Sequence, residues 1–219
     1  MYTLFGFRNS GSAAVECALE MTGAPYRIVE AASWQGNEAL AELERVNPLK
    51  QIPTLQLPNG TVLSESAAIL MHLGLAFPNS GLLSARPDER DLALRGLVFI
   101  AANCYSCITM IDYPERFTTA TDDAARQAVR AGARARLHAH WDIFADLHPA
   151  NDERFIGGDQ PGALDLLAAV VSKWSGTRQH VKTSRPAFSA LLERIDSHPA
   201  VAPVFGRHWP AASPSPAGA

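Results

Sequence analysis

Glu65 and Ser66 stand where a short apolar run is expected to lead into a helix. The free N–H groups of a helix's first turn, together with the Ser66 hydroxyl, can hold a carboxylate. The Glu65 carboxylate can hold an ammonium group beside it. The same stretch also makes ordinary capping chemistry, with Ser64 as N-cap and Glu65 in the first turn. The pattern therefore predicts a helix start that can cap itself and bind a small charged ligand.

The segment Asn47–Leu55, NPLKQIPTL, places a proline at the first position of a short apolar run. Proline has no N–H to give to a sheet, so Pro53 fits a strand only at an edge or at its first residue. The bond before a proline becomes cis at little cost, and a cis bond here would turn the Ile52 main chain outward. The alternative is an ordinary trans proline that opens an edge strand.

The elements that must position these residues alternate over roughly the first eighty residues. Apolar runs predict strands, helical spacing predicts helices, and Asn59–Gly60 marks a tight turn between two strands. The first helix is expected to begin with Ser12 as N-cap and to end at Gly23. The order β-α-β-α-β-β-α predicts a small mixed sheet, with one parallel pair joined by a crossover helix and one hairpin. The expected strands are 2–7, 26–31, 54–57 and 61–64, and the other expected helices are 37–46 and 65–77.

The rest of the chain carries helical patterns only, so we expect an all-helical second domain. Its third pattern is short and almost wholly apolar, which is typical of a central buried helix. The predicted organisation is a first domain at 1–79, a linker at 80–86, a helical domain at 87–209 and a disordered tail at 210–219. The helical patterns cover 86–113, 122–147, 162–176, 185–198 and 199–208.

Composition narrows the function classes. The chain has 219 residues, 47% of them hydrophobic and 19% charged, with a formal net charge of -3, so we expect a packed protein that binds neither nucleic acid nor membrane. Three cysteines do not indicate a disulfide framework, and neither a secretory signal nor a long apolar run is evident, so a cytoplasmic setting is expected. His138 and His140 are two residues apart and face different sides of a helix, and we expect no metal site.

Three motifs resemble those of the cytosolic glutathione transferase superfamily. They are NPLKQIPTL, the strand and helix start VLSESAAI at 62–69, and PGALDLLAAVV at 161–171. The resemblance covers roughly residues 1–208 without assigning a class, and implies a thioredoxin-like domain followed by an all-helical domain. It further implies a homodimer with glutathione as co-substrate.

The resemblance also implies roles for single residues at the glutathione site. Pro53 would be cis, and the Ile52 main chain would pair with the cysteinyl unit of glutathione. Glu65 and Ser66 would hold its γ-glutamyl end. Gln51 stands where many members carry a lysine that faces the glycyl carboxylate, so that end would meet a hydrogen-bond donor without a charge; the neighbouring Lys50 is a second candidate.

The thiol-activating donor is expected in the loop FRNSGSA at 7–13, which contains serines and no cysteine. The resemblance favours Ser10, then Asn9, with Ser12 as the helix cap; the alternative is a polar loop without a catalytic hydroxyl. A donor beside the sulfur, with the positive end of a helix behind it, would lower the thiol pKa. The electrophile pocket is expected between the domains, at Phe7, Arg8, Tyr105, Thr109 and Asp112.

Three functions follow from the resemblance. A glutathione transferase that conjugates small electrophiles, with a role in detoxification, is the first. A non-catalytic binding or regulatory protein is the second, and a glutathione-dependent isomerase or peroxidase on the same fold is the third. Cys104 and Cys107 are expected to be core or pocket-lining residues, and Asp165 is expected to cap a helix.

Overall fold

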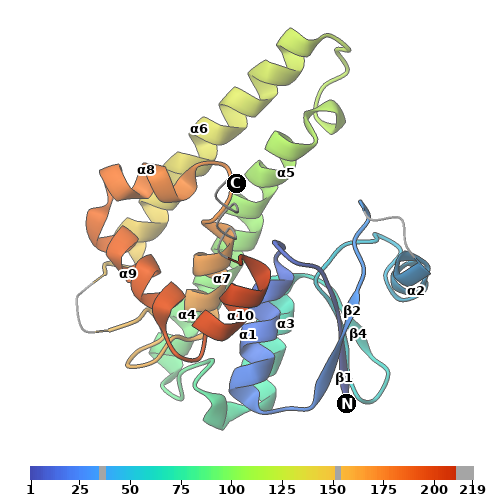
Figure 1. Ribbon diagram of the computed structural model, residues 1–219. Helices are drawn as coiled ribbons and strands as arrows, with labels where there is room; N and C mark the ends of the chain where they lie inside the picture. The colour runs from blue at the N-terminus through green and yellow to red at the C-terminus, as the bar shows by residue number, and fades with distance from the viewer. Residues whose placement is uncertain (35–37, 151–153, 211–219) are drawn as a thin grey trace, which may run out of the picture.

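The computed structural model describes residues 1–34, 38–150 and 154–210. It consists of a mixed sheet flanked by helices and a larger group of helices packed beside it (Figure 1). This is the thioredoxin-like domain followed by helices that the sequence predicts. The tail expected to be disordered lies outside the described residues, except for Pro210.

The sheet has the predicted mixed topology. Its strands are β1 (Tyr2–Gly6), β2 (Tyr26–Glu30), β3 (Thr54–Gln56) and β4 (Val62–Leu63). They lie in the order β2-β1-β3-β4. β1 and β2 are parallel, whereas β3 runs antiparallel to both β1 and β4. The two edge positions are therefore taken by β2 and by the second strand of the hairpin.

Helices cover both faces of this sheet. Successive side chains of a strand point to opposite faces, so Leu4 packs into the large core with α1 (Ser12–Thr22) and α3 (Ser66–Ala76). Phe5 points the other way and packs with Leu43 of α2 (Glu38–Val46). In Figure 1, α2 lies on the far side of the sheet from α1 and α3. The helical half thus packs against the α1 and α3 side alone.

The helical half contains the long predicted helices and one that the sequence did not predict. The first is continuous over α4 (Pro87–Phe99), a π-helical segment η2 (Ile100–Tyr105) and α5 (Ser106–Asp112). Figure 1 shows α5 and α6 running side by side away from the sheet. The helix α8 (Thr177–Ser184) was not predicted. The remaining helices are α6 (Asp123–Leu147), α7 (Ala163–Val171), α9 (Pro186–Ser197), α10 (Ala202–His208) and the short 3-10 helices η1 (Pro78–Ser80) and η3 (Pro114–Arg116).

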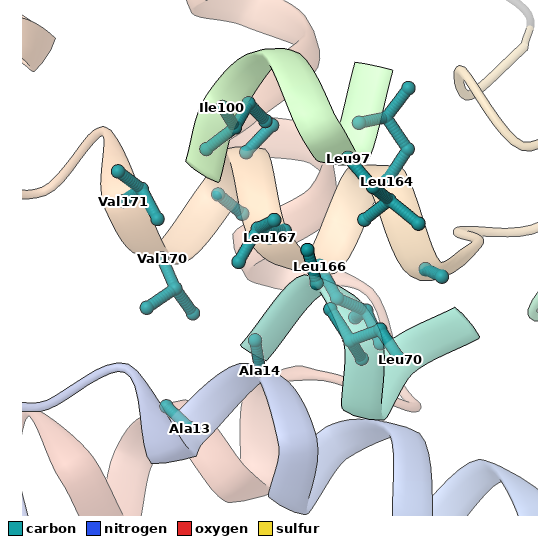
Figure 2. Packing of buried hydrophobic residues seen from close by; sticks show 14 of the residues in the cluster. Ala13, Ala14, Leu70, Leu97, Ile100, Leu164, Leu166, Leu167, Val170 and Val171 are labelled. Atoms are coloured by element: carbon teal, nitrogen blue, oxygen red, sulfur yellow. The ribbon is translucent and has the colours of Figure 1, made fainter. Parts of the chain in front are cut away.

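The helix α7 is buried along its whole length, as predicted. Figure 2 shows its side chains, Leu164 to Val171, between α4 on one side and α1 and α3 on the other. One apolar core therefore runs from the α1 face of the sheet through α7 into the helical half. The position of each domain relative to the other depends on this packing.

Asp165 fixes the start of α7. Its Oδ2 accepts hydrogen bonds from the N–H groups of Gly162 at 2.9 Å and Gly157 at 2.6 Å, and its Oδ1 accepts from Ile156 at 2.8 Å. Gly162 is the N-cap, so the expectation that Asp165 caps backward over a glycine is confirmed. The next N–H, from Ala163, donates to the Leu82 carbonyl at 2.8 Å and attaches the expected linker to α7.

Two predicted caps are wrong. The N-cap of α1 is Gly11, and Ser12 is the first helical residue. The N-cap of α3 is Glu65, not Ser64, and its φ of 67° lies in the left-handed region. In both cases the observed N-cap is a neighbour of the predicted one; Gly11 already has a helical backbone, whereas Glu65 turns the chain through a left-handed conformation.

One helix meets the length and composition of a membrane span. The continuous helix Pro87–Asp112 has a mean hydropathy of 1.5 in its most apolar 18-residue window, 39% of which is buried. The sequence reading found no such run. This helix packs against α6 and α7, as a core helix of the helical domain does.

Candidate functional site

Three of the predicted site segments meet at the edge of the sheet where β1 and β4 end and β3 begins. Phe5 of β1 pairs with Thr54 of β3, and Leu55 pairs with Leu63 of β4. Continuing this register brings Pro53 next to the end of β1 and opposite Glu65. The loop after β1, the Ile52–Pro53 bond and the start of α3 therefore lie together.

The Ile52–Pro53 peptide bond is cis, as the resemblance implied. Pro53 directly precedes β3, where its missing N–H takes no bond from the ladder. Within the described residues, neither the N–H nor the carbonyl of Ile52 has a hydrogen-bond partner. These two groups are thus free to pair with an extended peptide.

Asn47 holds the loop before the cis bond. Its buried side chain donates to the Gln51 carbonyl at 3.2 Å and to Thr54 Oγ1 at 2.9 Å, while the Thr54 hydroxyl donates to the same Gln51 carbonyl at 2.8 Å. Asn47 Oδ1 also accepts from the Leu49 N–H at 3.1 Å. Two side chains therefore fix the peptide that precedes Ile52, which sets the direction of the free main-chain groups.

Glu65 and Ser66 lie where the sequence placed them, at the end of β4 and the start of α3. Glu65 is exposed in a backbone conformation that side chains rarely adopt, a feature that concentrates at functional sites. Ser66 is buried in the first turn, whose N–H groups point toward the same edge. The pair offers an acceptor for an ammonium group and donors for a carboxylate.

Gln51 is exposed beside this loop, whereas Lys50 is engaged elsewhere. Lys50 Nζ lies 2.7 Å from Glu44 Oε1 on α2. The Lys50 backbone has a φ of 54°, which turns the chain between α2 and Ile52. Of the two candidates for the glycyl end of glutathione, Lys50 is bound to Glu44, whereas Gln51 is uncharged and exposed.

The loop after β1 uses its hydroxyls internally. Ser10 Oγ donates to the Phe7 carbonyl at 2.6 Å, lies 2.8 Å from Ser12 Oγ and accepts from the Ser12 N–H at 3.2 Å. Ser12 Oγ accepts from the Phe7 N–H at 3.2 Å. Asn9 is exposed with a φ of 56°. A serine has one hydrogen to donate, and the Phe7 carbonyl is its acceptor here.

The residues expected around an electrophile occupy two places. Phe7 and Arg8 line a cavity of about 320 Å³ under α10, together with Ile28, Glu16 and Arg207. Phe7 also packs edge-on against Trp34, with ring centroids 6.1 Å apart.

Tyr105, Thr109 and Asp112 lie instead along η2 and α5. Of these, Tyr105 reaches the sheet edge, where its hydroxyl contacts Gly11. The Thr109 hydroxyl donates to the Tyr105 carbonyl at 3.2 Å, and Asp112 is exposed at the end of α5. The structure thus brings Tyr105 to the cis-proline loop and leaves Thr109 and Asp112 farther along the helix.

A buried ion cluster that the sequence reading missed joins α1 to α10. Glu16 Oε1 accepts from Arg207 at 2.7 Å, and Glu16 Oε2 lies 2.7 Å from His208 Nε2. Burial raises the pKa of Glu16, but the hydrogen bonds from His208 and Arg207 lower it further, so the net pKa is below the ordinary value. The cluster connects residues about 190 positions apart and fixes the last helix on the first domain.

Cys104 and Cys107 are buried and free, like Cys17. Burial raises the pKa of both Cys104 and Cys107, so both are protonated thiols at neutral pH. Cys107 Sγ lies 3.9 Å from His140 Nδ1, and that nitrogen also lies 3.0 Å from the Asn103 carbonyl. Residues 1–34, 38–150 and 154–210 hold no group of three metal-ligating side chains.

Comparison with known proteins gives the chain a family. The N-terminal domain of glutathione S-transferases matches residues 1–74. The uncharacterised GST-like protein YncG of Escherichia coli (strain K12) is 27% identical over 217 residues, which are 95% of this chain and 98% of the relative. A sphingomonad glutathione S-transferase solved in complex with glutathione has a TM-score of 0.72 at 25% identity, over 95% of this chain and 100% of that chain. Residues 1–74 are a glutathione S-transferase N-terminal domain, and the chain as a whole has the fold of the cytosolic glutathione transferases.

Part of the chain also resembles an isomerase. Maleylacetoacetate isomerase of Rattus norvegicus is 35% identical over 88 residues, which are 39% of this chain and 40% of the relative. The chain has no cysteine in the loop after β1, and the uncharged Gln51 stands beside the cis-proline bond. The position of Tyr105 against Gly11 has no signal in the local sequence beyond its place in a long helix.

Proposed function

We propose that this chain is a glutathione transferase that conjugates the glutathione thiol to small electrophiles. The observation that carries the proposal is the meeting, at one sheet edge, of the unpaired Ile52 main chain with the Glu65–Ser66 helix start. In the reaction, the thiolate sulfur forms a bond to an electrophilic carbon, and the leaving group departs with its electron pair. Holding both reactants together supplies much of the rate.

Each site residue has a separate task in this proposal. The Ile52 N–H and carbonyl pair with the cysteinyl unit of glutathione as a one-residue strand addition. Ser66 and the first-turn N–H groups of α3 hold the γ-glutamyl carboxylate, and Glu65 holds the neighbouring ammonium. Gln51 faces the glycyl carboxylate without a charge. Phe7, Arg8, Thr109 and Asp112 are proposed to border the electrophile, and Ser10 and Asn9 are proposed to shape the loop beside the sulfur.

Calorimetric titration with glutathione tests the binding site. Glu65→Gln removes a charge-assisted bond worth about 1.5–3 kcal/mol, so affinity should fall about 10- to 100-fold. Ser66→Ala should weaken binding by up to about tenfold. Glu115→Gln, an exposed carboxylate in η3, is the matched control and should leave affinity unchanged. Equal affinity in the wild type and Glu65→Gln would remove the proposed site.

A binding protein without turnover is distinguished by activity. Conjugation of glutathione to a chloronitroaromatic compound releases chloride and produces a coloured thioether. We expect glutathione-dependent turnover that falls in Glu65→Gln in proportion to the lost affinity when glutathione is below saturation. Tight binding without turnover on a panel of electrophiles would support the regulatory alternative.

A glutathione-dependent cis–trans isomerase is the second candidate, because the partial relative from Rattus norvegicus carries that name. In that reaction the thiolate adds to a conjugated double bond, rotation follows, and elimination regenerates glutathione. A maleyl substrate that is isomerised with no net consumption of glutathione would favour this function over conjugation.

The assembly and cellular setting are part of the proposal. We infer a cytoplasmic homodimer that acts in detoxification. Leu75 of α3 and Leu92 and Val98 of α4 expose large apolar side chains on helices that contact each other, which supports a subunit interface there. Light scattering should give twice the chain mass of 23.6 kDa, and a monomer at micromolar concentration would contradict the dimer.

A further inference from the structure

Tyr105 is a residue of the helical domain whose hydroxyl lies in the proposed glutathione site. It ends the π-helical segment η2, and such segments are frequent at functional sites because they redirect side chains. The hydroxyl packs directly on Gly11, leaving no room for a side chain there. A β-carbon on Gly11 would also lie 3.5 Å from Pro53 Cδ. One small region is therefore shared by the start of α1, the cis-proline loop and the Tyr105 hydroxyl.

The ring of Tyr105 is packed, whereas its hydroxyl has no hydrogen-bond partner within the described residues. The ring packs against Trp174, with centroids 5.9 Å apart. Within the described residues, no protein group forms a hydrogen bond with the Tyr105 hydroxyl, although most inward-facing polar atoms are paired. The hydroxyl thus has a hydrogen available for a ligand at this edge.

Burial and a nearby carboxylate keep this hydroxyl protonated. Desolvation raises the pKa of Tyr105, and the carboxylate of Glu65 raises it further. Glu65 is the N-cap of α3, and the hydroxyl contacts Gly11, the N-cap of α1. At neutral pH, Tyr105 is therefore a donor and not a base.

The serine hydroxyls and the first-turn N–H groups beside the expected sulfur are already engaged. Ser10 Oγ donates to the Phe7 carbonyl. The N–H groups of Ser12, Ala13 and Ala14 bond to Ser10 Oγ at 3.2 Å, to the Ser10 carbonyl at 3.2 Å and to the Gly11 carbonyl at 3.3 Å. The first turn of α1 is satisfied by its own loop. Among the described residues, this leaves the exposed Asn9 amide and the Tyr105 hydroxyl as side-chain donors here, and Tyr105 is the one whose hydroxyl contacts Gly11.

We propose that the Tyr105 hydroxyl donates the hydrogen bond that stabilises the glutathione thiolate, in place of a serine of the loop after β1. The inference rests on the proposed function, since it names the residue that acts on the thiol of the same ligand. Gly11 takes part by its lack of a side chain, which lets the tyrosine of one domain reach the peptide site of the other.

The pKa of the bound thiol tests this assignment directly. The thiolate absorbance of glutathione in the saturated complex is titrated against pH for the wild type and Tyr105→Phe. A hydrogen bond to a charged group corresponds to about one to two pKa units, so the variant's bound thiol should titrate that much higher. At a pH below the thiol pKa, the conjugation rate of Tyr105→Phe should be about 10- to 100-fold lower than that of the wild type, because less of the bound thiol is ionised. Affinity for S-methylglutathione, which has no thiol to ionise, should change less than about twofold.

Two further variants make the result specific. Gly11→Ala pushes the hydroxyl away and should raise the thiol pKa in the same direction, provided S-methylglutathione still binds. Tyr26→Phe removes a hydroxyl that bonds Glu20 at 2.8 Å, at the opposite end of the sheet, and should leave the thiol pKa unchanged. Melting curves by circular dichroism establish that each variant is folded.

The outcomes separate this inference from the proposed function. A wild type that binds neither glutathione nor S-methylglutathione overturns the proposed function, and the assignment of Tyr105 with it. A wild type that binds both, with the same thiol pKa in Tyr105→Phe, overturns the assignment and leaves the function standing. A larger shift in Ser10→Ala than in Tyr105→Phe would return the role to the loop.

Discussion

Replacing Asp165 by alanine should lower the unfolding free energy by about 3–5 kcal/mol at pH 7.5. The side chain is fully buried and accepts three main-chain hydrogen bonds. The Gly162 N–H is buried, and leaving it unpaired costs about 1–3 kcal/mol. Ile156 and Gly157 are half-buried, so water can replace part of their bonds, and each contributes about 1 kcal/mol.

Urea unfolding followed by circular dichroism measures this loss. Asp123→Ala is the matched control, because Asp123 is 95% exposed and its one ion pair within the described residues is with Arg126 at 3.5 Å. That control should change stability by less than about 0.5 kcal/mol. A loss below about 1 kcal/mol for Asp165→Ala would refute the capping argument, since a single buried unpaired N–H already costs that much.

The pH dependence of the same pair gives a second check. Burial raises the pKa of Asp165 to about 6, against the lowering effect of its three N–H donors. A raised acid pKa means that the folded chain binds a proton that the unfolded chain does not, between the unfolded value of about 3.9 and about 6. The additional stability from this proton uptake is therefore complete below the unfolded pKa and is lost as the pH rises through 6, whereas the hydrogen bonds to Asp165 still contribute at pH 7.5. The stability gap between the wild type and Asp165→Ala should widen by about 1 kcal/mol from pH 7.5 to pH 5.

Two further predictions concern contacts that support the site. Glu16→Gln should lower the unfolding free energy by about 1–2 kcal/mol at pH 7, because it removes the charge of a buried carboxylate that binds Arg207. The loss is moderate because Arg207 is half exposed and solvent screens part of the interaction. The folded pKa of Glu16 is lowered, so this contribution is present above the unfolded pKa of about 4.3 and is lost as the pH falls through the folded value. The urea midpoints of the two proteins should therefore converge as the pH falls below the unfolded value. Asn47→Ala should weaken glutathione binding about tenfold in calorimetry while the chain stays folded, since it releases the Gln51 carbonyl that orients Ile52; unchanged affinity would show that the loop holds itself.

Short-range patterns predicted much of the fold and the peptide end of the site. Period-two and helical spacing gave the strands, the hairpin and the long helices, because each depends on neighbours within a few residues. The cis bond before Pro53 was implied by the resemblance of NPLKQIPTL to a family motif, whereas the proline alone left a trans bond open. Asp165, three residues after Gly162, indicated the backward cap, which follows from local chemistry.

The features that the sequence reading missed depend on distant partners or on backbone detail. Glu16 meets Arg207 and His208 only after the whole chain has folded. The turn that aims the Ser10 hydroxyl at a carbonyl depends on the left-handed Asn9. The helix α8 was missed because TRQHVKTS has little apolar spacing, and it is held by its packing with α6 and α9.

The proposed site divides its work between two domains, and this makes domain docking part of the chemistry. The strand edge supplies main-chain groups for the peptide, while the Tyr105 hydroxyl arrives from a helix of the other domain. Its distance to a sulfur therefore depends on how α7 seats against α1 and α3 and on the attachment of α10 to Glu16. A hydrogen bond to a thiolate weakens within a few tenths of an ångström. Substitutions in the docking core should thus alter thiol ionisation before they alter glutathione binding, because the groups proposed to hold the peptide, the Ile52 main chain and the start of α3, all belong to the first domain.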